Sequence, residues 1–213
     1  MRNNTNSKIK EIFSLVKSLP YFGFDNLAGI EKNRVYLKIL FYRYKKAGKL
    51  IGLKKGVYVS REYIDKIEKS GTVGFYAEFI ANILYIPSYL SLEYVLYEHN
   101  ILTEIPVNIT SISKNKTARF SNEFGNFLYH KIKSDLFTGF TIVKKGDFII
   151  FKATKAKALF DFLYFRKNLI MDRKAFLELR LNLENLNKKD LSELKKYINI
   201  EGSKKMKEIL SYF

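Results

Sequence analysis

A helix followed by a tight hairpin is the pattern that most constrains how this chain can fold. An apolar stripe at helical spacing predicts a helix over residues 32–47, and its members are Leu37, Leu40, Phe41 and Tyr44. Gly48 follows, where a left-handed residue commonly ends a helix. Two segments suited to short strands, 50–53 and 57–60, then flank Lys54-Lys55-Gly56, which predicts a hairpin with a basic tip.

Two shorter helices are expected before this pattern, over residues 7–18 and 24–28. The order helix, short helix, longer helix and basic hairpin is typical of a winged helix-turn-helix, in which the third helix enters the major groove of duplex DNA. The first helices and the wing then hold phosphates. The sequence therefore predicts a winged helix-turn-helix DNA-binding domain over residues 1–70.

The candidate DNA-binding residues lie at the start of the longer helix, on its exposed side and at the hairpin tip. They are Lys32, Asn33, Arg34, Lys38, Tyr42, Lys45, Lys46, Lys54 and Lys55. Asn can pair with adenine and Arg with guanine at base edges. Alternatives stay open, because a cationic helix face is often only solvated, Asn33 can be an N-cap, and Tyr42 can pack with Val35 and Ile39.

The net charge of +17 favours a polyanionic partner, of which nucleic acid is the obvious one in a cytoplasm. Residues 1–70 hold +10 of this charge and residues 71–213 hold +7. A basic binding module joined to a more neutral domain would give this asymmetry. The alternative is a Lys-rich background throughout the chain.

Residues 71–213 are expected to form an α+β domain with a mostly antiparallel sheet and C-terminal helices. Helices are predicted over 75–85, 88–99, 155–167, 172–182, 187–197 and 202–212. Strands are predicted over 105–113, 116–120, 125–133, 140–144 and 147–153. The candidate secondary DNA contacts are the cations in or beside these strands, Lys114, Lys116, Arg119, Lys131 and Lys133. The alternative is that these side chains lie on strand faces that are only solvated.

Composition and motifs argue against a catalytic centre. The chain has no cysteine and two histidines, which excludes disulfides and thiolate chemistry and makes a metal site unexpected, so no cofactor is predicted. No phosphate loop, nucleophile elbow or zinc-protease motif is present. A metal-dependent nuclease using Asp135, Asp147 or Asp161 is the remaining enzymatic alternative. No apolar run reaches the ~18 residues that span a bilayer, and the polar N-terminus predicts a cytoplasmic protein.

Several segments, in this order and spacing, are similar to one known family. They are Ala-Gly-Lys-Leu-Ile (47–51), Lys-Lys-Gly-Val-Tyr-Val-Ser (54–60), Pro-Ser-Tyr-Leu-Ser-Leu (87–92), His-Asn-Ile-Leu (99–102), Phe-Leu-Tyr-His-Lys-Ile-Lys (127–133), Leu-Phe-Thr-Gly-Phe (136–140) and Ala-Thr-Lys-Ala-Lys-Ala-Leu-Phe-Asp (153–161). The chain resembles the AbiEi-type antitoxins, winged-helix regulators of type IV toxin–antitoxin systems that act in abortive infection, a phage defence. It departs from the family pattern at Ala156, where Glu is expected.

The resemblance implies a transcriptional repressor that binds inverted repeats in the promoter of its own operon. It also implies that the second domain supports cooperative DNA binding and counteracts a nucleotidyltransferase-like toxin, without requiring a stable complex. The alternative to a DNA-binding repressor is a protein–protein interaction module whose basic surface neutralises a toxin directly.

Overall fold

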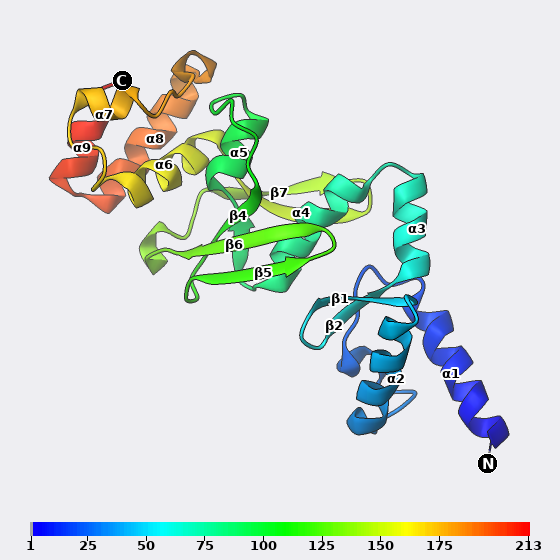
Figure 1. Cartoon of the computed structure of the whole chain (residues 1–213). Coiled ribbons are helices and arrows are strands. Elements are labelled where there is room, and N and C mark those ends of the chain that lie inside the picture. The colour runs from blue at the N-terminus through cyan, green and yellow to red at the C-terminus, as the bar shows by residue number, and fades with distance from the viewer. Residues whose placement is uncertain (1) are drawn as a thin grey trace. The chain divides into compact units, whose positions relative to one another are not determined.

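The computed structural model describes residues 2–213, and the side chains from Ser7 onward. The chain is a mixed α+β protein (Figure 1). Its contacts divide it into two compact units. The first unit extends to Ala77 and includes Ser121–Phe124, and the second comprises Glu78–Phe120 and Gly125–Phe213.

Helices and one hairpin make up most of the first unit. The elements are α1 (Arg2–Val16), the 3₁₀ helix η1 (Phe24–Leu27), α2 (Arg34–Lys46), β1 (Leu50–Lys54), β2 (Val57–Ser60) and α3 (Arg61–Lys69). β1 and β2 pair antiparallel, and Gly56 closes their turn with a φ of 80°. The predicted helices and hairpin are confirmed, although α1 begins earlier than residue 7.

The core of the first unit is built around Phe41 of α2. Leu37, Leu40 and Phe41 are buried, which confirms the predicted apolar stripe. The ring of Phe41 stacks on Phe24, with 5.4 Å between the ring centroids, and meets Tyr58 edge-on at 5.0 Å. One face of α2 is therefore committed to the core, and its other residues must face outward.

The second unit is a six-stranded sheet packed with helices. Its elements are α4 (Val73–Leu84, which begins in the first unit), β3 (Ser88–Leu90), α5 (Leu92–Glu98), β4 (Asn108–Ser113), β5 (Ala118–Asn122, whose last two residues belong to the first unit), β6 (Gly125–Lys131), η2 (Ser134–Leu136), β7 (Phe140–Lys145), β8 (Phe148–Ala153), α6 (Lys155–Arg166), α7 (Arg173–Leu177), η3 (Leu183–Asn185), α8 (Lys188–Glu201) and α9 (Lys204–Leu210). The strand order is β5-β6-β4-β3-β8-β7.

Parallel pairings at the centre of the sheet depart from the predicted, mostly antiparallel arrangement. β7–β8 pair antiparallel as the predicted hairpin, and β3, which was not predicted as a strand, pairs antiparallel with β4. β4–β6 and β3–β8 pair parallel, because the chain crosses over between these strands. The sheet is therefore mixed.

Three predicted elements of the second unit are wrong in detail. Residues 88–99 do not form one helix, because β3 inserts between β4 and β8 with all three of its residues buried, and α5 begins only after Ser91. The predicted strand over 105–113 begins at Asn108, since Pro106 has no N–H to donate to a ladder. The predicted helix over 172–182 ends at Leu177.

An ion pair without solvent exposure lies inside the second unit. Lys157 and Asp161 are one turn apart on α6, both are 0% exposed, and Nζ lies 2.7 Å from Oδ1. Lys157 also donates to the carbonyl of Leu136 at 2.8 Å. Asp161 accepts from Ser91 Oγ at 2.7 Å and from the Tyr89 hydroxyl at 3.1 Å. Burial raises the pKa of Asp161 and lowers the pKa of Lys157, and the contact between the two opposes both shifts.

A glycine lies next to this pair, at a position where there is no room for a side chain. Gly139 has a φ of 75°, and a Cβ there would lie 2.2 Å from the Tyr197 hydroxyl and 2.9 Å from Lys157 Cγ. The segments 87–92, 136–140 and 153–161 therefore meet at one buried network.

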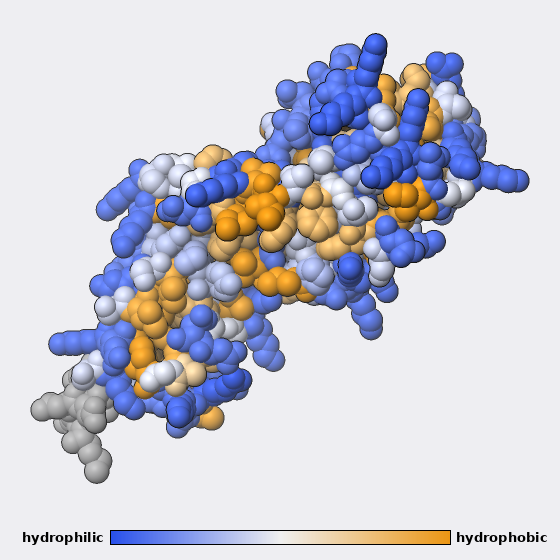
Figure 2. All heavy atoms as spheres, turned by 180° about the vertical axis from the view of Figure 1, so that it is seen from behind, coloured by the Kyte–Doolittle hydropathy of each residue, from blue (hydrophilic) through white to orange (hydrophobic). Residues whose placement is uncertain are grey.

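Figure 2 shows the outside of the molecule on one face, where hydrophilic residues project from most of the surface and hydrophobic residues form separate patches. The helices of the described chain include none that is both long and apolar enough to cross a membrane.

The Asp161→Ala substitution tests the buried pair, because it leaves the Lys157 ammonium buried without its carboxylate. We expect a loss of about 3–5 kcal/mol in the free energy of unfolding, measured by urea denaturation followed by circular dichroism. The double variant Lys157→Met/Asp161→Leu removes both charges and should recover most of that loss. A loss below about 1 kcal/mol for Asp161→Ala would contradict the account.

Candidate nucleic-acid interface

The N-terminus of α2 is fixed by a side-chain cap. Asn33 Oδ1 accepts from the backbone N–H groups of Val35 at 3.1 Å and Tyr36 at 3.0 Å. The Asn33 N–H in turn donates to Glu31 Oε1 at 2.9 Å. This hydrogen bond and that from Lys8 hold the pKa of Glu31 below its usual value. The structure thus shows the N-cap role, one of the two roles considered for Asn33.

The outward face of α2 is basic and partly apolar. The helix contains five Lys or Arg residues and no Asp or Glu. The predicted residues Lys38, Lys45 and Lys46 are exposed, as is Tyr42. Lys46 Nζ lies 5.1 Å from the centre of the Tyr42 ring. The predicted side chains of this helix therefore share one solvent-facing surface.

Arg34, at the first turn of α2, pairs with Asp25 of η1. The arginine side chain is 66% exposed and the aspartate 88%. Exposed ion pairs of this kind contribute little to stability, so the guanidinium can exchange its partner at small cost. Lys32, just before the helix, is exposed.

The hairpin lies against the C-terminal part of α2. A Cβ at Gly52 of β1 would lie 3.1 Å from Lys45 Nζ, so the lysine side chain extends from the helix across the strand. At the tip, Lys55 is exposed and Lys54 is partly buried, which lowers the pKa of Lys54. The structure brings Lys45 of the helix close to the strand that leads to this tip.

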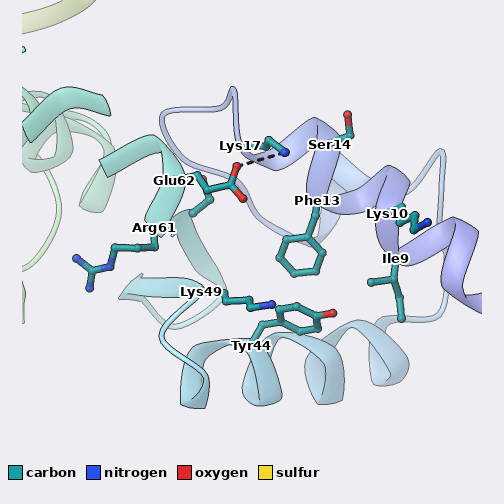
Figure 3. Close-up of a pocket in the computed structure, with 10 residues that line it drawn as sticks. Ile9, Lys10, Phe13, Ser14, Lys17, Tyr44, Lys49, Arg61 and Glu62 are labelled. Atoms are coloured by element: carbon teal, nitrogen blue, oxygen red, sulfur yellow. Dashed lines mark ion pairs between the residues drawn. The ribbon is translucent and has the colours of Figure 1, made fainter. Parts of the chain in front are cut away.

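A groove of about 530 Å³, absent from the sequence predictions, lies beside α1, α2 and α3 (Figure 3). Phe13 and Tyr44 form its aromatic wall, with ring centroids 4.1 Å apart, and Lys49 Nζ lies 5.5 Å from the Tyr44 ring. Lys17 pairs with Glu62 at 3.2 Å at its rim. Tyr44, predicted to face the core, packs against it and also lines this groove. No signal in the sequence indicated that α1 and α3 would come together here.

The secondary candidates in the second unit are exposed, and four of them gather at one end of two neighbouring strands. Ser113 and Lys131 are register partners in the parallel pair β4–β6, so the chain leaves both strands at the same end. The predicted residues near that end are Lys114, Lys116, Lys131 and Lys133, whereas Arg119 lies in β5.

Other cations of the second unit serve internal contacts. Lys152 is 6% exposed and pairs with Glu78 at 2.7 Å and with Glu98 at 2.8 Å. Lys157 is committed to Asp161. Part of the positive charge of this unit is thus neutralised inside it and is not available to a partner.

The carboxylates considered for a nuclease do not gather. Asp161 lies in the buried ion pair, whereas Asp135 and Asp147 are exposed. Over residues 2–213, no group of three or more His, Cys, Asp or Glu side chains is arranged to hold a metal ion.

Comparison with known protein families finds no match for this chain, and comparison with curated proteins finds none either. The resemblance to AbiEi-type antitoxins therefore rests on the quoted segments alone.

The cap at Asn33 can be tested by two substitutions, one that removes the acceptor and one that retains it. Asn33→Ala should lower the stability of the first unit by about 1 kcal/mol, because two backbone N–H groups lose their acceptor. Asn33→Asp retains an acceptor at the helix N-terminus and should stay close to the wild type. Urea denaturation followed by circular dichroism measures both, and an equal loss in the two variants would contradict a capping role.

Proposed function

We propose that the first unit is a winged helix-turn-helix that binds duplex DNA, with α2 in the major groove and the β1–β2 hairpin at the phosphate backbone. The observation that carries this proposal is the outward face of α2, which combines five Lys or Arg with no acidic residue and lies beside a basic hairpin. The element order helix, 3₁₀ helix, helix, hairpin supports the same assignment.

The physical basis of such binding is electrostatic. Each Lys or Arg that neutralises a phosphate releases a condensed counterion, so the affinity falls steeply as salt rises. The exposure of Lys38, Lys45 and Lys46 on α2 supports this role, as does the position of Lys54 and Lys55 at the hairpin tip. Arg34 can reach a guanine after leaving the exposed carboxylate of Asp25.

We further propose that the chain is a cytoplasmic antitoxin that represses its own toxin–antitoxin operon by binding inverted repeats. The family resemblance supports this role, and three of the resembling segments meet at the buried Lys157–Asp161 network. In this proposal the second unit counteracts the nucleotidyltransferase-like toxin. Phosphate contacts are added by its predicted secondary residues, which are Lys114, Lys116, Arg119, Lys131 and Lys133. Growth rescue when the chain is co-expressed with the product of the neighbouring gene supports the role, and no rescue contradicts it.

A direct protein partner for the second unit is the second candidate. Ile142 of β7 is 67% exposed and faces its register partner Phe151 of β8, which is 37% exposed. Ile149 on the same hairpin is 53% exposed. Apolar side chains grouped on an edge hairpin favour a protein contact over a nucleic-acid contact. Co-purification of a partner that survives high salt would support this candidate.

The hairpin tip gives the sharpest electrostatic prediction. Lys54→Ala/Lys55→Ala should weaken binding to all duplex sequences alike and should lower the slope of log Kd against log salt by about 2. The measurement is fluorescence anisotropy over a salt series, with the region upstream of its own gene and a scrambled duplex as probes.

The matched control for that series is Lys195→Ala/Lys196→Ala on α8, which removes the same charge from two exposed neighbours in the second unit. It should leave the slope close to the wild-type value. Equal effects of the two double variants would contradict a specific role for the hairpin.

A further inference from the structure

Three apolar side chains occupy the middle of the outward face of α2. Val35 is 65% exposed, Ile39 48% and Tyr42 60%. At about 100° per residue, they lie opposite the buried stripe of the same helix. Val and Ile are also weaker helix formers than Leu, Lys or Ala, so helix stability does not explain their presence at these exposed positions. A grouped apolar patch at such a place marks a contact surface.

Charge decides which partner this surface fits. The patch is surrounded by the Lys and Arg residues of a helix that has no acidic side chain. A second copy docked face to face would bring like charges together without compensation. A polyanion is attracted by the cations, and it must also offer apolar groups to the centre of the face.

The major groove of DNA offers one such group, because the C5 methyl of thymine is its only apolar feature. Near the start of α2, Asn33 Oδ1 is engaged in the protein itself, because it caps the helix. Arg34 is held only by its exposed pair with Asp25 and remains a polar reader. The side chains that point outward without such a protein contact in the first two turns include Val35 and Ile39.

We propose that Val35 and Ile39 contact thymine methyl groups, so that this helix prefers thymine at the base pairs that these two side chains reach. This inference rests on the proposed DNA-binding function and names the feature of the duplex that the same surface reads. Lys38 and Lys46, on the same exposed face, then hold the phosphates on either side of the groove.

The test uses two 20-base-pair duplexes of alternating A and T, one with thymine and one with uracil in every thymine position. Uracil keeps all hydrogen-bonding groups and lacks only the methyl. Burying one methyl group changes affinity by about fourfold, so two contacts give about fifteenfold tighter binding of the thymine duplex. Fluorescence anisotropy at one fixed salt concentration measures the ratio of the two Kd values.

Val35→Ala/Ile39→Ala separates a side-chain contact from an effect of DNA shape. Both residues are exposed and Ala favours helices, so the fold is retained. The thymine-to-uracil ratio should fall toward one in this variant. Ile142→Ala/Ile149→Ala removes two comparably exposed side chains from the second unit and should keep the wild-type ratio.

The outcomes distinguish this inference from the function on which it rests. Equal affinity of the wild type for the two duplexes overturns methyl readout, while salt-sensitive binding to both keeps the DNA-binding function. A ratio that survives in Val35→Ala/Ile39→Ala also overturns it. Absence of salt-sensitive binding to either duplex overturns both proposals. A wild-type dimer that is lost in Val35→Ala/Ile39→Ala, as measured by sedimentation, would assign the patch to a second copy and overturn the inference.

Discussion

The Lys157 ammonium and the Asp161 carboxylate lie 2.7 Å apart on α6 with no exposure to solvent. Two charges taken out of water cost several kcal/mol unless every remaining hydrogen-bonding position is used. Here β3 supplies Tyr89, the adjoining Ser91 supplies a hydroxyl, and the segment before β7 supplies the Leu136 carbonyl. The pair therefore fixes how a helix, a central strand and a connecting segment meet, and the packing of the second unit depends on it.

The first unit is organised by a different constraint, the division of α2 into two faces. The inner face holds the Phe41 cluster, and the outer face carries cations around Val35, Ile39 and Tyr42. Because the inner face is fully used for folding, substitutions on the outer face can alter binding with little effect on stability. The same division places a surface of uniform charge sign next to the hairpin, which is the arrangement that attracts a polyanion.

Local signals explain which parts of this fold the sequence predicted. The α2 stripe, Gly48 and the basic turn depend on neighbours in the chain, and they were predicted closely. β3 could not be predicted from local signals, because it is a strand only through its pairing with distant residues such as Ser113 of β4 and Lys152 of β8. No local signal distinguished Lys157 from other lysines, because its burial follows from tertiary contacts. Asp161 was considered as a nuclease carboxylate, and the structure shows it in the buried ion pair with Lys157 instead.

The proposed DNA-binding mode requires that the outer face of α2 meets the major groove. The most direct test is photo-crosslinking to an A/T-rich duplex that carries 5-bromouracil, whose bromine occupies the place of the thymine methyl, followed by mass spectrometry of the crosslinked peptides. The account predicts crosslinks within Arg34–Lys46, the residues of α2. Crosslinks confined to residues 78–213, with none in α2, would contradict it.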